Sequence, residues 1–238
     1  LSNRPILVGA VTDGPGHNER QTTSMWWPPS SPQPTSTYHK RNLVPFGEWI
    51  PARSFFLPLI PILGKIGRQS VPGMTPGVVD ATIAGRRVPV GVVVCFEVAY
   101  DSTVADTVRH GAKILAVQSN NSSFIGTAQT PQQWQITRAR AVETGRHIVV
   151  STTNSFSGLV NPDGSVALRT EEGVHTHFTV ATPLESGLTI GVQIAPWLRI
   201  IVLVMTAEAI AMSLLQRRRD MLAQANHNRS ERNVRHRH

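Results

Sequence analysis

Apolar runs alternate with polar, helix-compatible segments through the middle of the chain. Continuous apolar runs at residues 88–94, 112–117 and 147–152 are typical of strands that are buried on both faces of a sheet. Between them we expect one helix over 102–110, capped by Asp101 or Ser102 and followed by Gly111. A second helix is expected to begin at Thr130-Pro131 and to stop at Gly145. This order of elements predicts an α/β domain with a mixed sheet.

The segments on either side of this core are less regular. Residues 5–11 are predicted to form a buried strand, and residues 12–37 a long irregular connection, because Pro, Ser, Thr and Gly dominate the latter. Residues 55–63, FFLPLIPIL, are strongly apolar but carry two prolines, which interrupt helices and sheets alike. We expect an apolar loop there, either buried or near lipid. A hairpin is expected around residues 161–164, Asn-Pro-Asp-Gly.

A different pattern begins at residue 194. Residues 194–216 are almost continuously apolar, with Trp197 near one end and three arginines, 217–219, beyond the other. About 20 apolar residues suffice to cross a bilayer as a helix, and such flanks favour a cytoplasmic C-terminus. Glu208 near mid-span opposes this by about 2.5–3.5 kcal/mol unless it is paired, and the alternative is an amphipathic surface helix. We therefore predict a domain at 1–193, a transmembrane helix at 194–216, and a basic, disordered cytoplasmic tail at 217–238.

The net charge of +8 on 238 residues adds little to the picture of the fold. Seven arginines against two acidic residues after position 216 account for +5 of it, and we find no nucleic-acid-binding motif. One cysteine, Cys95, excludes an intramolecular disulfide. The histidines show no metal-ligand spacing, so neither a metal nor a cofactor is expected. Because the chain starts on an apolar run at Leu1, we expect it to be the C-terminal part of a longer protein.

Cys95 is the candidate nucleophile. It ends a predicted buried strand that leads toward a helix, although a lone buried cysteine is more often a small hydrophobic residue. A nearby cation would favour its thiolate, and Lys40 could supply that charge and also stabilise an oxyanion. Asn120 and Asn121 follow the next strand, where they would line the pocket or form a turn.

Several motifs together resemble the apolipoprotein N-acyltransferase branch of the nitrilase superfamily. The specific pair is YHKRNLVPFGEWIP, residues 38–51, with VGVVVCFEVAY, residues 90–100. Further agreement comes from GAKILAVQSNNSSF, RARAVETGRHIVVSTTNSFSG and VNPDGSV. The resemblance runs from about residue 5 to about residue 215. It implies a nitrilase-like αββα sandwich, here incomplete because its N-terminal part is absent, followed by a membrane helix.

The resemblance also implies roles for individual residues. Cys95 would take an acyl chain from phospholipid as a thioester, and Lys40 would be the lysine of a Glu-Lys-Cys triad. Glu48 and Glu97 would support the site. Trp49 and Asn120 are taken as substrate-binding residues. The partners implied are a phospholipid acyl donor, a diacylglyceryl lipoprotein acceptor and the membrane, with no nucleic acid, and the domain would lie on the extracytoplasmic face of a bacterial cell membrane.

One departure from the family pattern bears on activity. The triad's general base is a glutamate well upstream of the lysine, whereas the only glutamate before Lys40 is Glu19, in a predicted loop. We therefore predict that this chain alone is inactive or nearly so, since general acid–base catalysis typically contributes about 10²–10⁴-fold. Two alternatives remain: a soluble nitrilase-type amidase, against which the apolar segments argue, and a truncated, non-catalytic membrane protein.

Overall fold

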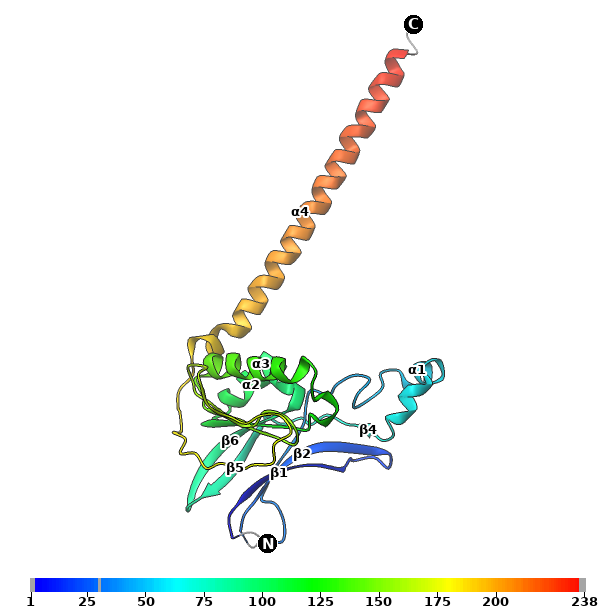
Figure 1. Ribbon diagram of the computed structural model, residues 1–238. Coiled ribbons are helices and arrows are strands. Elements are labelled where there is room, and N and C mark those ends of the chain that lie inside the picture. The colour runs from blue at the N-terminus through cyan, green and yellow to red at the C-terminus, as the bar shows by residue number, and fades with distance from the viewer. Residues whose placement is uncertain (1–2, 30, 236–238) are drawn as a thin grey trace. The chain divides into compact units, whose positions relative to one another are not determined.

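The computed structural model describes residues 3–29 and 31–235, with side chains described up to Met221. The chain divides into two compact units, Leu1–Val192 and Gln193–His238. We describe each unit by itself. The first contains both sheets and every candidate site residue, and the second consists of most of one long helix (Figure 1).

A six-stranded mixed sheet is the centre of the first unit. Its order is β10-β9-β8-β7-β6-β5, in which β6, β7 and β8 are parallel and the outer pairs are antiparallel. The parallel strands match the three predicted apolar runs. The bounds are β5 Val78–Ile83, β6 Arg86–Val94, β7 Ile114–Ser119, β8 Ile148–Thr152, β9 Gly158–Val160 and β10 Val166–Arg169.

Both faces of this sheet are covered, which explains the lack of polar alternation in β6. Val93 packs with the helices, whereas Val92 and Val94 pack with Trp26 and Tyr38 of the second sheet. Successive side chains of a strand point to opposite faces, so a strand between two layers must be apolar at nearly every position.

Helices α2 (Asp101–Arg109) and α3 (Gln129–Thr144) cover one face of the six-stranded sheet (Figure 1). Gly145 ends α3 in the left-handed conformation at φ 61°, as predicted. The predicted starts are wrong by one or two residues. Tyr100 and Ala128 occupy the N-cap positions without side-chain caps, because the chain enters each helix directly from a preceding turn.

The second sheet has four strands and overturns the prediction that residues 12–37 are irregular. β1 (Ile6–Asp13) pairs antiparallel with β2 (Glu19–Trp27), which also pairs with β3 (Ser36–His39) and the short β4 (Gln69–Ser70). β2 forms despite its polar sequence because it is the central strand of this sheet and hydrogen-bonds on both sides. Trp26, near the end of β2, is only 6% exposed and packs between the two sheets. β1 is a strand as predicted, but several of its residues are exposed rather than buried.

The apolar segment after Trp49 is a helical projection and not a loop. α1 (Arg53–Leu59) is followed by the 3₁₀ turn η1 (Pro61–Lys65). Pro58 is tolerated near the end of α1 because the helix is so short that few hydrogen bonds depend on that position. Two further 3₁₀ turns, η2 (Cys95–Ala99) and η3 (Ser122–Phe124), follow β6 and β7.

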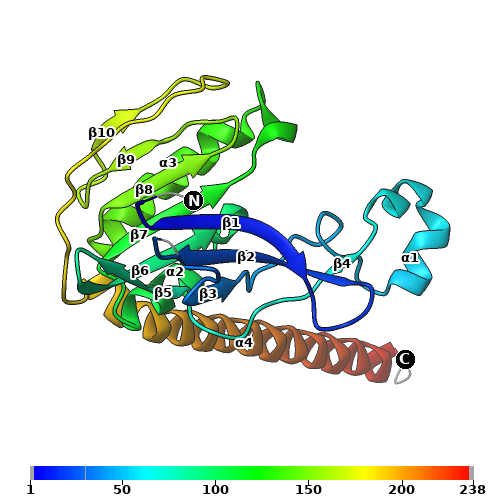
Figure 2. The same ribbon diagram turned by 90° about the horizontal axis from the view of Figure 1, so that it is seen from below.

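These elements form a helix layer, a six-stranded sheet and a four-stranded sheet, which is the order expected for a nitrilase-like sandwich. Figure 2 shows the four-stranded sheet from its outer side, where no helix of residues 3–29 or 31–192 covers it. The fold class predicted from the sequence is confirmed in these layers.

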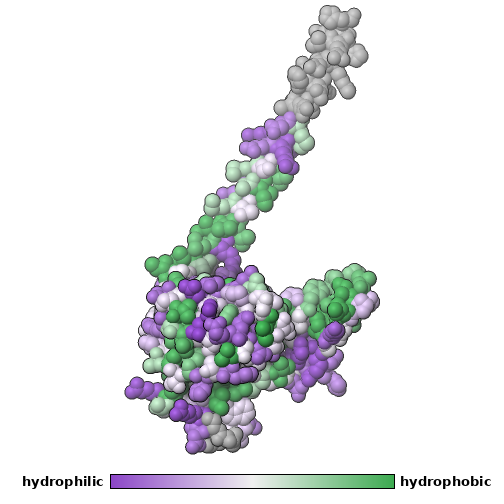
Figure 3. All heavy atoms as spheres, viewed as in Figure 1, coloured by the Kyte–Doolittle hydropathy of each residue, from purple (hydrophilic) through white to green (hydrophobic). Residues whose placement is uncertain are grey.

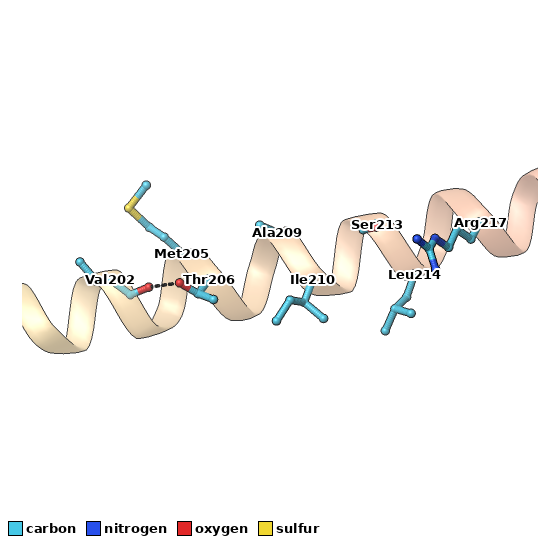
Figure 4. Close-up of a pocket in the computed structure, with 8 residues that line it drawn as sticks. All are labelled: Val202, Met205, Thr206, Ala209, Ile210, Ser213, Leu214 and Arg217. Atoms are coloured by element: carbon cyan, nitrogen blue, oxygen red, sulfur yellow. Dashed lines mark hydrogen bonds between the residues drawn. The ribbon is translucent and has the colours of Figure 1, made fainter.

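The second unit consists of α4 (Ile190–Arg235) from residue 193 onward. Its part from Ile190 to Met221 has a mean hydropathy of 2.0 and is long and apolar enough to cross a membrane. Thr206 donates its hydroxyl to the carbonyl of Val202 at 2.7 Å (Figure 4), which satisfies this polar group within the helix. We expected residues 217–238 to be disordered; the structure continues α4 to Arg235, and neither Gly nor Pro occurs between residues 217 and 235 to interrupt it. Residues 236–238 lie outside the described part.

Candidate active site

Cys95 stands at a sharp turn between β6 and η2. Its backbone has a φ of 54°, in the left-handed region that non-glycine residues rarely adopt, and its side chain is half-buried. Such strain costs of the order of 1–2 kcal/mol and persists only where the surrounding structure enforces it. The turn therefore places the only thiol of the chain at the end of a rigid, fully packed strand.

Glu97 enforces this turn from within. Its carboxylate is fully buried and accepts the backbone N–H of Val94 at 2.9 Å through Oε2. Oε1 accepts the backbone N–H groups of Arg41 and Asn42, at 2.7 and 3.1 Å, and the hydroxyl of Tyr38 at 2.8 Å. Four donors thus satisfy a charge that would otherwise be costly to bury. One carboxylate joins the cysteine turn to the segment that carries Lys40.

Lys40 directly follows β3 and is almost completely buried. Its backbone donates to Thr22 O and accepts from Gly73 N, both at 2.8 Å, so the main chain is held on two sides. The ammonium Nζ lies 2.7 Å from Glu48 Oε2, and the two side chains are 2% and 20% exposed. An ammonium has three donors, and among the described residues only Glu48 receives one from Lys40. Two of its N–H groups therefore have no acceptor among the described residues.

The Pro-Phe-Gly turn directs Glu48 back toward Lys40. Phe46 adopts a φ of 60° and donates its N–H to Trp49 O at 2.8 Å, while Glu48 N donates to Val44 O at 2.9 Å. The Glu48 carboxylate also accepts the N–H of Val44 at 2.8 Å. Residues 40–48 thus form one loop, and the ion pair between Lys40 and Glu48 closes it.

Tyr38 supports the same cluster. It is fully buried, and this burial, followed by the adjacent negative charge of Glu97, raises the pKa of its hydroxyl. The phenol therefore stays protonated at neutral pH and remains a donor to Glu97. No role for Tyr38 was predicted from the sequence, because a tyrosine near the end of a strand carries no sequence signal for such a contact.

The two predicted substrate-binding residues lie at different places. Trp49 lines a cavity of about 350 Å³ together with Arg41 and Tyr100. Asn120 lines another, of about 460 Å³, with residues of β1, β2 and β8. Neither cavity includes Cys95. The roles of Trp49 and Asn120 in binding substrate stay predictions.

Cys95 itself lines a third cavity, of about 290 Å³. Its wall includes Phe96, Asn121 and three glutamines from the start of α3, Gln129, Gln132 and Gln133. Lys40 is not among the lining residues, so its expected role as a cation near the Cys95 thiol stays a prediction. No group of three or more His, Cys, Asp or Glu side chains in the described part of the chain could hold a metal ion.

An exposed apolar surface extends from the site loop. We call residues 53–65, which contain α1 and η1, the apolar arm. The part of the surface at α1 appears as a strongly hydrophobic lobe in Figure 3. Phe56 stacks edge-on against both Phe46 and Phe55, at centroid distances of 5.5 and 5.1 Å. The large side chains exposed by at least 40% on the arm are Phe55, Leu59, Ile60 and Ile62. The charged residues within the arm are basic, Arg53 and Lys65.

Two stacked sheets, a cysteine at the turn after β6, and a buried Lys40–Glu48 pair linked to that turn through Glu97 fit the class of carbon–nitrogen hydrolases. The family model for the carbon-nitrogen hydrolases matches residues 15–186, and the chain belongs to this family. Among solved structures it is similar to an amidase of Nesterenkonia sp., with a TM-score of 0.51 and 18% identity over 71% of this chain and 58% of that one. A nitrilase-superfamily protein of Saccharomyces cerevisiae gives a TM-score of 0.51 at 16% identity, over 70% of this chain and 55% of that one. At these identities the likeness concerns the fold.

Curated relatives narrow the family to the branch suggested by the motifs. An apolipoprotein N-acyltransferase of Mycolicibacterium smegmatis is 33% identical over 216 residues, which are 89% of this chain and 35% of that protein. Another from Gloeobacter violaceus is 31% identical over 201 residues, 81% of this chain and 36% of that protein. The chain thus resembles N-acyltransferases of the nitrilase superfamily, and it spans about a third of the length of these relatives.

Proposed function

We propose that this chain carries the acyl-accepting cysteine of an apolipoprotein N-acyltransferase. The observation that carries the proposal is the cluster in which the buried Lys40–Glu48 pair and the Glu97 carboxylate are joined to the turn of Cys95. The donor would be a phospholipid and the acceptor the N-terminal diacylglyceryl-cysteine of a lipoprotein. The names of the curated relatives support this reaction, and the match covers only part of each relative.

In the first half-reaction, Cys95 Sγ attacks the ester carbonyl carbon of the phospholipid. The C–O bond to the glycerol breaks, and the thiol proton passes to the departing alcohol oxygen, which leaves a lysophospholipid and an acyl thioester. The free N–H groups of Lys40 would stabilise the negative oxygen of the tetrahedral intermediate. Glu48, at 2.7 Å from Nζ, fixes the direction of the ammonium, so that little reorganisation would be required during the reaction.

In the second half-reaction, the α-amine of the acceptor attacks the thioester carbonyl. The C–S bond breaks, an amide forms, and the proton lost by the amine returns to the thiolate of Cys95. Both steps require a base, and Glu19 is a poor candidate because its Oε2 accepts the N–H of Gly16 at 2.8 Å in the turn before β2. We therefore retain the expectation that the chain alone is inactive or nearly so.

The apolar arm and α4 support action at a membrane. Exposed aromatic and aliphatic side chains flanked by Arg53 and Lys65 suit an anionic lipid surface, which would admit the acyl donor near the Lys40 loop. Trp197 and Arg217–Arg219 would lie at opposite interfaces, with the domain extracytoplasmic and the C-terminus cytoplasmic. In a Cys95→Ala background, an impermeant maleimide should label Glu171→Cys in intact spheroplasts and Ser230→Cys only after permeabilisation. The reverse pattern would exclude this orientation.

Mass spectrometry of the acylated enzyme tests the reaction itself. The chain would be expressed alone, and also together with the parts of the M. smegmatis relative that the match does not cover, which we call the complemented protein. After incubation with phospholipid vesicles, the complemented protein should gain one acyl mass that hydroxylamine removes and that Cys95→Ala lacks. The chain alone should gain little or none. An unmodified Cys95 in a complemented protein that nevertheless hydrolyses small amides would favour an amidase instead.

A further inference from the structure

The cavity at Cys95 differs chemically from the rest of the site. Its lining contains no charged side chain, but it contains four carboxamides, those of Asn121, Gln129, Gln132 and Gln133. From this composition we infer that it is a subsite for the peptide backbone of the acyl acceptor, next to the attacking amine. The inference rests on the proposed function and assigns to these residues the binding of one of the two substrates.

The inner part of this cavity is preorganised. Asn121 is 4% exposed and donates its Nδ2 to Gln133 Oε1 at 2.6 Å, and Ser119 Oγ donates to Asn121 Oδ1 at 2.6 Å. Arg140 on α3 donates to the carbonyls of Val98 and Ala99, at 2.9 and 3.0 Å. These bonds fix α3 against the cysteine turn, so the wall opposite Cys95 cannot drift away from the thiol.

The outer part has hydrogen-bonding capacity to spare. Gln129 and Gln132 are exposed at the start of α3, and within the described residues their side-chain amides have no hydrogen-bond partner. Each carboxamide offers donors and an acceptor, which is the complement of a peptide group. Exposed, unpaired amides that face the same cavity as the only thiol are therefore suited to bind a peptide that approaches it.

The alternatives fit this cavity less well. The phosphate of a phospholipid headgroup favours an arginine or lysine, and the lining contains neither. A long acyl chain favours a uniformly apolar wall, which the apolar arm offers and four carboxamides do not. A volume of about 290 Å³ is also at the lower end for ligand sites and suits a short stretch of chain rather than a whole lipid.

The geometry of the reaction also requires the acceptor to bind close to Cys95. An attacking amine must come within about 3–3.5 Å of the thioester carbon. Consecutive Cα atoms are about 3.8 Å apart, so the first peptide group of the acceptor must then lie within a few ångströms of Cys95. A cavity that shares its wall with Cys95 meets this condition, whereas those of Trp49 and Asn120 do not include the cysteine.

The two half-reactions separate this role from donor binding. In the complemented protein we would measure thioester formation and, separately, transfer to a synthetic dipalmitoylglyceryl-Cys-Ser-Ser peptide, for Gln129→Leu, Gln132→Leu and the double variant. Transfer should fall about tenfold in kcat/KM per lost hydrogen bond, mainly through KM, with thioester formation within twofold of the parent. Gln135→Leu is the matched control, because Gln135 lies on the same helix but accepts from Arg138 outside the cavity.

A second acceptor makes the test specific. Dipalmitoylglyceryl-cysteamine has the amine but no peptide group, so parent and variants should acylate it at equal rates. Unchanged transfer to the peptide in the double variant would overturn the subsite, and so would an equal loss in both half-reactions. If the parent forms no thioester at all, the proposed function fails, and the subsite fails with it.

Discussion

The backbone N–H of Arg41 lies 2.7 Å from Glu97 Oε1, although 56 residues separate the two in the chain. This bond connects the residue after Lys40 to the residue two positions after Cys95. The segments that carry the candidate nucleophile and the candidate oxyanion-binding lysine are therefore linked by one buried carboxylate. We propose from this relationship that Glu97 is a positioning residue whose removal would affect both segments.

Replacing Glu97 by Gln should destabilise the domain and displace the Lys40 segment. The neutral amide can accept at one end only, so the N–H of Val94 or those of Arg41 and Asn42 would lose their acceptor, at about 1–3 kcal/mol for a buried group. Denaturant unfolding of the chain measures the loss of stability, and in the complemented protein thioester formation should fall in the folded fraction. Glu171→Gln, at an exposed position, serves as the control. Full stability together with full acylation in Glu97→Gln would contradict the positioning role.

The Lys40–Glu48 pair should show strong coupling in a double-mutant cycle. Removing one partner of a buried ion pair typically costs about 3–5 kcal/mol, and the partial exposure of Glu48 places the effect near the lower end. Lys40→Met with Glu48→Leu should recover much of the stability lost in either single variant, because no charge is then left unpaired. Acylation should remain abolished wherever Lys40 is absent. If the double variant forms the thioester, Lys40 has only a structural role.

Substitutions at Cys95 should reveal the backbone strain at the turn between β6 and η2. Glycine adopts a positive φ readily, so Cys95→Gly should be more stable than Cys95→Ala by about 1 kcal/mol. Thermal unfolding of the two variants gives the difference, and Val94→Gly compared with Val94→Ala is a control at φ −101°. There glycine should be the less stable residue. An equal or lower stability of Cys95→Gly would show that the turn relaxes without the thiol.

The raised pKa of the buried Tyr38 hydroxyl should make the folded domain less stable at alkaline pH. Burial and the charge of Glu97 raise the pKa of its hydroxyl in the folded state above the ordinary value near 10. Its contribution is therefore complete below pH 10 and decreases as the pH rises toward the folded-state pKa, because the unfolded chain releases the proton first. Denaturation midpoints at several pH values should decline above pH 10 in the parent and less steeply in Tyr38→Phe. Parallel pH profiles would refute this interpretation.

Glu208 should hinder membrane insertion of α4. A carboxylate near the centre of a spanning helix opposes insertion by about 2.5–3.5 kcal/mol, so Glu208→Leu should raise the inserted fraction of residues 190–221 in a translocon assay. Ser213→Leu, one turn further along the same helix, removes a smaller polar group and should have a much smaller effect. Equal insertion of the parent and Glu208→Leu would indicate that the glutamate is paired or lies outside the bilayer core.

Local sequence patterns were sufficient to predict the strands that are buried on both faces of the sheet. The apolar runs of β6, β7 and β8 allow one structure only, because such a strand must lie between two layers, and Gly145 marks a helix end through its own backbone preference. The segment of β2 was mistaken for a loop because its polar residues pair through the backbone with β1 and β3, and backbone pairing leaves no mark on side-chain composition.

The sequence, with its resemblance to a known family, predicted Cys95, Lys40, Glu48 and Glu97 as site residues. Its apolar pattern predicted a helix at 194–216, which in the structure begins at Ile190. Tertiary structure decided which of the two asparagines after β7 borders the thiol. Asn120 lines a cavity together with residues of β1 and β2, whereas Asn121 lines the cavity of Cys95 at the start of α3. Tertiary structure also placed Tyr38 and the three glutamines, because contacts between distant segments depend on how layers pack and not on the identity of neighbours in the chain.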